Sequence, residues 1–239
     1  MTGLSVAVVV PFGSMGCAWR DRNFLHITGW IGQHHPGWPV FTGLSDRVPF
    51  SPAQARNSGA GLAGDWDVIV FWDADTLAHP DAVNEAVRRA HADPVMVLAG
   101  DSHIYSDELS ADRYLANGLM FPKPRGDNMK PFGKEGIYRR PCSGIVAVGR
   151  RLWDATGGYI DCLGGEDSHE DLAFFQQCQI FGDGVQWVAG IQVHLWHPPA
   201  PRRNGRNHAV WQRLATMQRC GISRADVATY LATLGHRVP

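Results

Sequence analysis

Continuous hydrophobic runs alternate with amphipathic stretches along most of the chain. The first run, LSVAVVVPF (4–12), is apolar at consecutive positions and ends at Pro11 and Gly13, as expected of a strand buried on both faces. The next stretch, WRDRNFLHITGWIGQH (19–34), has apolar residues at the three- and four-residue spacing of a helix. Repeated alternation of this kind predicts an α/β domain with a parallel sheet and helices on both of its faces.

The same two patterns recur along the rest of the chain. Apolar runs bounded by turn residues predict strands over 38–44, 67–72 and 95–100, a strand and a short helix over 144–158, and a strand pair over 185–197. Helical spacings predict helices over 51–64, 79–93 and 169–182, with two more in the tail, 208–234. Residues 101–141 are less regular and rich in glycine, proline and charge, so we expect a surface excursion there rather than a separate domain.

The composition is that of an ordinary globular domain. The 239 residues carry a net charge of −1, so no overall basic field indicates nucleic acid or an anionic membrane as a partner. The five cysteines include no CxxC pair, which argues against a disulfide framework or a structural zinc site and for a reducing compartment. The run 4–12 is too short to span a bilayer and has no cleavage signature. We therefore expect no membrane segment and a cytoplasmic protein.

Two carboxylates follow a predicted buried strand in VIVFWDADTL (68–77). Asp73 and Asp75 end an apolar run, where isolated charges are costly unless a metal, a cation or solvent pairs with them. Ligands bind at the carboxyl ends of strands in parallel α/β sheets, which makes this position a candidate site. The simpler interpretation of an isolated DxD is a turn capped by Asp73, with Asp75 capping the helix that begins near Pro80.

Six short motifs, one of them DAD, occur along the chain in the same order as in a known family of enzymes. They are VVVPF (8–12), ARN (55–57), DAD (73–75), SGIVAVGRRLWDATGGY (143–159), GGEDSHEDLAFF (164–175) and VHLWHPP (193–199). Over about residues 4–200 the chain resembles the glycosyltransferase family 2 enzymes of the GT-A fold. The resemblance implies one GT-A (Rossmann-like) domain over 1–207 with a mixed, mostly parallel sheet. Its nucleotide-binding half is expected over about 1–100 and its acceptor half over about 101–207, with a helical extension, 208–239, packed on the same domain.

In such enzymes the DxD motif holds a divalent cation against the diphosphate of a sugar nucleotide, and a late histidine completes the metal site. The resemblance therefore implies Asp75 and His194 as metal ligands, with His197 as the second choice for the histidine. Residues three apart on a strand face opposite sides, so we do not expect both histidines to bind one ion. Carboxylate and imidazole ligands favour Mn²⁺ over Mg²⁺. The candidate donor-binding residues are Pro11, Phe12, Arg20, Arg56, Asn57, Asp73, Ala74 and Gly144.

The resemblance also implies an ED pair that supplies the catalytic base and contacts the acceptor. GGEDSHED offers two such pairs, 166–167 and 170–171, and either could simply favour the dipole of the following helix. The spacing from Gly157–Gly158 and the apolar residues that follow favour the second pair. We therefore expect Asp171 as the base of an inverting transfer, Glu170 as a residue that orients the acceptor, and Asp167 as the alternate base.

Two other functions are compatible with parts of the sequence. DADTL also resembles the haloacid dehalogenase-type phosphohydrolases, in which Asp73 would be the nucleophile and GDSHIYSD (100–107) a later acidic motif. That resemblance leaves HED and HLWHPP unexplained and places the DxD on the third strand rather than the first. A non-catalytic sugar-nucleotide-binding module would keep the metal site and need no base.

The donor and acceptor are only partly specified. The expected donor is a nucleotide-diphosphate sugar, with a UDP-sugar as the first candidate. The acceptor hydroxyl is open between a glycan, a protein and a modified nucleobase, because fold does not fix substrate. The basic segment PRRNGRNH (201–208) fits either a lid over the bound donor or an idle surface loop.

Overall fold

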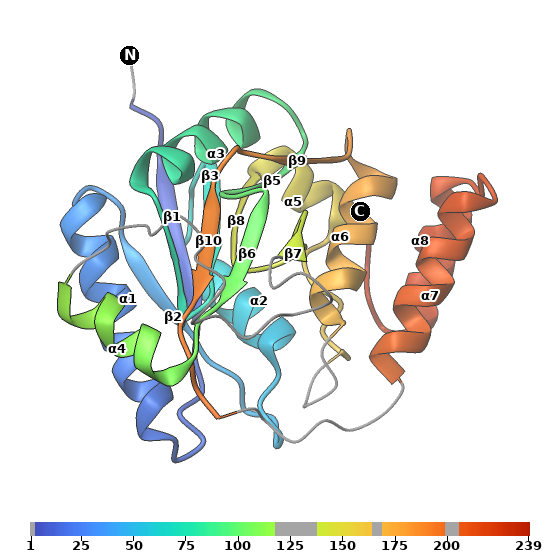
Figure 1. The fold of residues 1–239 in the computed structure, drawn as a ribbon. Coiled ribbons are helices and arrows are strands. Elements are labelled where there is room, and N and C mark those ends of the chain that lie inside the picture. The colour runs from blue at the N-terminus through green and yellow to red at the C-terminus, as the bar shows by residue number, and fades with distance from the viewer. Residues whose placement is uncertain (1–2, 118–137, 164–168, 199–205) are drawn as a thin grey trace.

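The structure, a computed structural model, describes residues 3–117, 138–163, 169–198 and 206–239, and it is built around a six-stranded sheet (Figure 1). The strand order is β2-β1-β3-β8-β5-β9. The strands are β1 (Val6–Pro11), β2 (Val40–Gly43), β3 (Val68–Trp72), β5 (Met96–Leu98), β8 (Ile145–Gly149) and β9 (Val185–Trp187). Only β8 runs antiparallel to its neighbours in this sheet, so the predicted mixed, mostly parallel sheet is confirmed.

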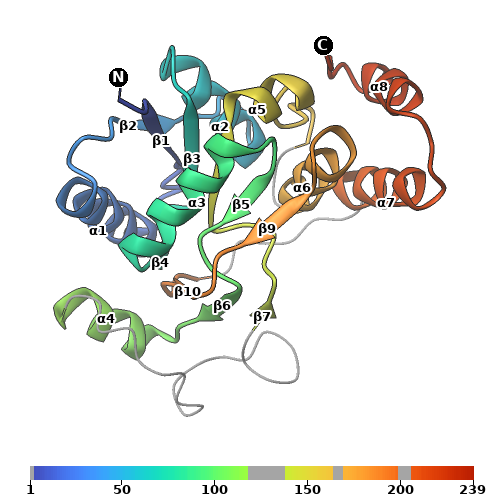
Figure 2. The same cartoon turned by 90° about the horizontal axis from the view of Figure 1, so that it is seen from above.

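Helices cover both faces of this sheet, as predicted (Figures 1 and 2). On one face lie α1 (Ala18–His34) and α3 (Pro80–Ala92), and on the other α2 (Pro52–Leu62), α5 (Arg150–Thr156) and α6 (Glu170–Phe181). Alternate residues of each strand pack in the cores on the two faces of the sheet, since successive side chains of a strand point to opposite faces. In β1, Val8 packs in the core beneath α1 and α3, whereas its neighbour Val9 packs in the core beneath α2 and α6.

The two proline-led helices begin where the sequence predicts. Ser51 accepts a hydrogen bond from the Gln54 N–H at the start of α2, and Pro52 occupies the first turn. His79 performs the same function for α3, where its side chain accepts from the Asp81 N–H. Asp75 is therefore not the cap of this helix. The interpretation of the DxD as a plain turn and helix cap is wrong for this residue.

A second, smaller sheet lies beyond the carboxyl end of β3. Its strand order is β4-β10-β6-β7, formed by β4 (Thr76–Ala78), β6 (Ser102–Tyr105), β7 (Tyr138–Arg139) and β10 (Ile191–His194). The expectation of an irregular excursion over 101–141 is wrong at both ends, because β6 and β7 pair there and α4 (Glu108–Asn117) follows β6. The sequence of β6, SHIY, is mostly polar, and its pairing with β10 forms the strand. Residues 118–137 lie outside the described ranges.

The C-terminal helices pack against α6. They are α7 (Arg206–Arg219) and α8 (Arg224–Thr233), and Figure 1 shows them on the side of α6 away from the sheet. Leu214 and Leu231 share a buried cluster with Ile180 and Phe181 of α6. Within the described residues, no helix is both long and apolar enough to cross a bilayer.

Candidate active site

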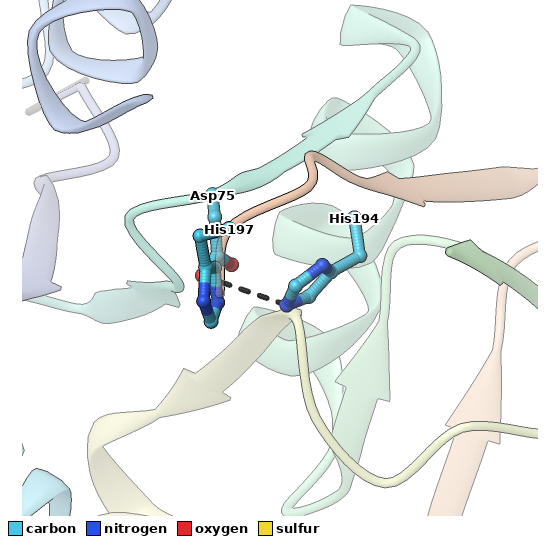
Figure 3. Close-up of side chains that lie close together, drawn as sticks. All are labelled: Asp75, His194 and His197. Carbon is cyan, nitrogen blue, oxygen red and sulfur yellow. Dashed lines mark ion pairs between the residues drawn. The ribbon is translucent and has the colours of Figure 1, made fainter. Parts of the chain in front are cut away.

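Asp75, His194 and His197 come together at the junction of the two sheets (Figure 3). Asp75 lies in the turn between β3 and β4, and β10 pairs antiparallel with β4, which sets His194 opposite Thr76. The Nε2 atoms of His194 and His197 lie 3.5 Å and 3.1 Å from Oδ2 of Asp75. One ligand atom from each of the three residues lies within 4.8 Å of the others. The arrangement can hold a divalent cation through one carboxylate and two imidazoles.

The premise for expecting only one histidine at the ion, that the two side chains face opposite sides, is wrong, because the strand does not continue through both. β10 ends at His194, and the Leu195 N–H then donates to the backbone oxygen of Asp75. The hydroxyl of Ser106 donates to the His194 carbonyl and accepts from the Trp196 N–H. Together these bonds turn the chain so that His197 returns to the side of His194.

The protonation states of Asp75 and His194 suit a cation, whereas His197 differs: burial would lower its pKa, but the hydrogen bond and charge of Asp75 raise it. Burial alone would raise the pKa of Asp75, but His194, a hydrogen bond from His197 and the charge of Arg20 outweigh it, so the pKa lies well below its usual range. Burial lowers the pKa of His194, with Asp75 opposing the shift, and so favours the neutral imidazole that binds metals.

Arg20, a candidate donor-binding residue, lies beside this centre. It is half-buried in the first turn of α1, and its positive charge acts on Asp75, His194 and His197. A guanidinium in this position suits the phosphate groups of a ligand held by the cation.

Asp73 is held by two donors. Its Oδ1 accepts from Nη2 of Arg56 at 2.7 Å and its Oδ2 from the Gly144 N–H at 3.1 Å. Gly144 has a φ of +102°, and a Cβ there would lie 2.1 Å from Oε1 of Gln192, so only glycine fits. Burial, with the charges of Asp75 and Asp171, raises the pKa of Asp73 despite Arg56.

Arg56 and Asn57, both predicted to bind the donor, make internal contacts. Arg56 is 5% exposed, and its Nη1 lies 3.2 Å from Oε1 of Glu170 while Nη2 contacts Asp73. Asn57 donates to the Tyr159 carbonyl and accepts from the Tyr159 N–H, both at 2.9 Å. Both side chains thus make their hydrogen bonds to other residues of the protein.

The remaining predicted donor residues line the turns at the strand ends. Pro11 closes β1 opposite Gly43, and Phe12 stacks on Phe24 with 4.1 Å between ring centroids. Ala74, between the two acidic residues, is half-buried and packs against the core.

Asp171 occupies the first turn of α6 and is half-buried, whereas Glu170 beside it is buried. The thiol of Cys142 lies 3.6 Å from Oδ2 of Asp171, and the Leu172 N–H donates to Oδ1. The loop that contains Cys142 and Gly144 therefore contacts both acidic motifs. The Gly144 N–H donates to Asp73, and the Cys142 thiol donates to Asp171. The alternate base, Asp167, and the basic residues 201–205 lie outside the described residues.

Tyr105 is a site residue that the sequence did not reveal. Its ring lies 4.7 Å from that of His194 and stacks on His103 at 4.9 Å between centroids. Burial and the charges of Asp75 and Asp171 raise its pKa well above its usual range, so the phenol lies within electrostatic reach of both. The only available signal was a β-forming aromatic at the end of SHIY, in a segment that we expected to be irregular.

Comparison with solved structures identifies the fold. A Drosophila β1,4-galactosyltransferase 7 mutant, in complex with manganese, UDP-Gal and xylobiose, is 17% identical, with a TM-score of 0.52 over 87% of this chain and 79% of that one. GalNAc-T7 with UDP, GalNAc and Mn²⁺ is 13% identical, with a TM-score of 0.50 over 90% of this chain. This chain spans 48% of the length of GalNAc-T7. No protein-family model and no curated protein matches the sequence. These likenesses show that the chain has the GT-A fold of glycosyltransferases.

Proposed function

We propose that this protein is a metal-dependent glycosyltransferase that moves a sugar from a nucleotide-diphosphate sugar to an acceptor hydroxyl. The observation that carries the proposal is the cluster of Asp75, His194 and His197 at the carboxyl end of β3. The GT-A fold supports it, because of the two similar structures described above one holds manganese with UDP-Gal and the other Mn²⁺ with UDP.

Asp75, His194 and His197 would hold the cation and leave other coordination positions for diphosphate oxygens. Mn²⁺ suits two imidazoles and a carboxylate better than Mg²⁺ does, since Mg²⁺ prefers oxygen ligands alone. The bound cation would stabilise the negative charge that develops on the departing nucleoside diphosphate. Arg20 adds a fixed positive charge from α1 on the same side. UDP is the expected nucleotide.

Asp171 is the proposed general base of an inverting transfer. Its carboxylate is half-buried and oriented by Cys142 and the Leu172 N–H, so it can accept the proton of an acceptor hydroxyl. Glu170 is buried against Arg56, so its effect on the acceptor would be exerted through the position of Asp171. The acceptor is a hydroxyl of a glycan, a protein or a modified nucleobase.

A screen of nucleotides tests the donor site directly. UDP with Mn²⁺ is expected to raise the melting temperature, because a ligand that binds only the native state adds ~2.7 kcal/mol of stability at about 100 times its Kd. For a chain of this size that corresponds to a rise of about 5–10 °C. GDP and dTDP serve as competitors for the identity of the base, and each nucleotide is repeated with EDTA. A shift that survives EDTA undiminished would be evidence against metal-dependent donor binding.

The phosphohydrolase alternative predicts a different reaction. Asp73 forms an ion pair with the buried guanidinium of Arg56 and also accepts from the Gly144 N–H, and a carboxylate whose charge is neutralised by a cation is a poor nucleophile. The purified protein is therefore expected to release no phosphate from p-nitrophenyl phosphate, yet to release UDP slowly from its sugar nucleotide with water as acceptor. Phosphate release that disappears in Asp73→Asn would establish the phosphohydrolase instead. Donor binding without any turnover would favour a binding module.

A cytoplasmic location is also part of the proposal. All five cysteines are free: three are half-buried, Cys178 is buried and Cys220 is exposed. Free thiols are the usual state in a reducing compartment.

A further inference from the structure

We propose that Arg56 is a positioning residue that joins the donor motif to the base-carrying helix and so fixes the separation between Asp75 and Asp171. The inference rests on the proposed function. It assigns Arg56 a different task from the donor binding that the sequence suggests.

The contacts join three elements that are distant in sequence. Arg56 lies on α2, and its two terminal nitrogens contact Asp73, 17 residues away, and Glu170, 114 residues away. The Arg56 side chain is 6% exposed and that of Glu170 is 9% exposed, so both charges are nearly withdrawn from water. The guanidinium also lies 5.0 Å from the centroid of the Tyr159 ring.

The chemistry of the bridge requires arginine. Buried carboxylates are costly unless a cation and hydrogen bonds satisfy them, and one planar guanidinium can serve two at once. Burial raises the pKa of Glu170, and the charge of Arg56 opposes that rise. A lysine at this position would carry a point charge that can hold only one of the two carboxylates at a time.

The position of the bridge connects the two halves of the reaction. Asp73 shares a turn with the metal ligand Asp75, and Glu170 precedes Asp171 in the first turn of α6. Asn57, next to Arg56, holds the Tyr159 backbone and so ties α2 to the same region through a second set of bonds. Loss of the bridge would let the DxD turn and the start of α6 move independently, and misplacement by about 1 Å can cost ~100-fold in rate.

The test is a double-mutant cycle of Arg56→Met and Glu170→Gln, read in two assays. The first assay is UDP release from the UDP-sugar that the screen identifies, with water as acceptor, and the second is the affinity for UDP with Mn²⁺. Each single variant is expected to lower kcat by about 100-fold and to change the UDP affinity by less than about threefold. The double variant should lose no more than either single one, because both changes remove the same bridge.

Matched controls separate positioning from simple stability. Arg88→Met makes the same exchange in an exposed ion pair with Glu85 and should leave kcat unchanged. Arg56→Lys keeps the positive charge but lacks the planar guanidinium that contacts both carboxylates, so its kcat should lie between those of the wild type and Arg56→Met. If Arg56→Met does not fold, Arg56→Lys and Glu170→Gln form the cycle instead.

Two results would overturn the inference. A large loss of UDP affinity in Arg56→Met, additive with Glu170→Gln, would mean that Arg56 binds the donor itself. An unchanged kcat in the folded variants would mean that the bridge has no catalytic effect. Both results require an active wild-type protein. A wild type that binds and turns over no sugar nucleotide would overturn the proposed function first, and the inference with it.

Discussion

Replacing Asp75 with alanine is expected to abolish Mn²⁺-dependent binding of UDP in a protein that still folds. Loss of a residue that merely supports a metal ligand already costs about 10–100-fold in metal affinity, so loss of the carboxylate ligand should cost ~100-fold or more. The fold should survive because the bond that Asp75 makes to Leu195 uses its backbone oxygen. Titration calorimetry of UDP with and without Mn²⁺ measures the affinity, and circular dichroism checks the fold.

Variants of the two histidines test whether they bind the same ion as Asp75. His194→Ala and His197→Ala should each lower the Mn²⁺-dependent affinity strongly, because the Nε2 atoms of both lie within reach of the same ion. Asp81→Ala removes an exposed carboxylate from α3 and should change nothing. Full Mn²⁺ dependence in His197→Ala would reduce the site to the two ligands that the sequence suggested. Unchanged Mn²⁺-dependent binding of UDP in all three site variants would mean that DAD forms a plain turn and not a metal site.

The main layers of the fold could be predicted because they depend on local patterns. Continuous apolar runs such as those of β1 (Val6–Pro11) and β3 are buried in the structure, and the carboxyl end of β3 marks the edge where the site forms. The prediction failed at β6, whose sequence SHIY has only one aliphatic residue and is ordered by its pairing with β10. Strand formation there depends on a partner almost 90 residues away, which a local pattern does not contain.

Prediction of the site failed at single residues for the same reason, because their orientation depends on partners distant in sequence. A histidine three positions after another on a strand should face away, and only the tertiary bonds of Ser106 and of the Leu195 N–H show that the strand has already ended. An arginine in an amphipathic helix is usually solvated, and nothing near Arg56 in sequence reveals that its partners are Asp73 and Glu170. Motif order could thus place the acidic and imidazole groups, whereas tertiary contacts decide which of them point into the site.

The spatial order of these groups limits the possible chemistry. The charges of both Asp75 and Asp171 act on the phenol of Tyr105, so the metal cluster and the proposed base both lie near this residue. A cation-bound diphosphate and an acceptor hydroxyl would meet there with the sugar between them. The proposed inverting transfer is a single displacement, which requires the base and the leaving group to lie on opposite sides of the anomeric carbon.

Asp171→Asn is expected to lower turnover by about 10²–10⁴-fold while UDP binding with Mn²⁺ is retained. The substitution keeps the shape of the side chain and its oxygen for the Leu172 N–H, but removes the group that takes the acceptor proton. General-base assistance has a value of this order in enzymes. Release of UDP from the sugar nucleotide measures kcat, and calorimetry measures the affinity of the same preparation.

Comparison with Asp167→Asn decides which acidic pair supplies the base. That variant should be only mildly impaired, whereas an inactive Asp167→Asn beside an active Asp171→Asn would move the base to the first pair of GGEDSHED. The configuration of the product gives an independent check. With a carboxylate that only accepts a proton, the hydroxyl attacks from the face opposite the diphosphate and the anomeric configuration inverts. A product that retains the configuration of the donor would require a different mechanism, in which Asp171 is not the base.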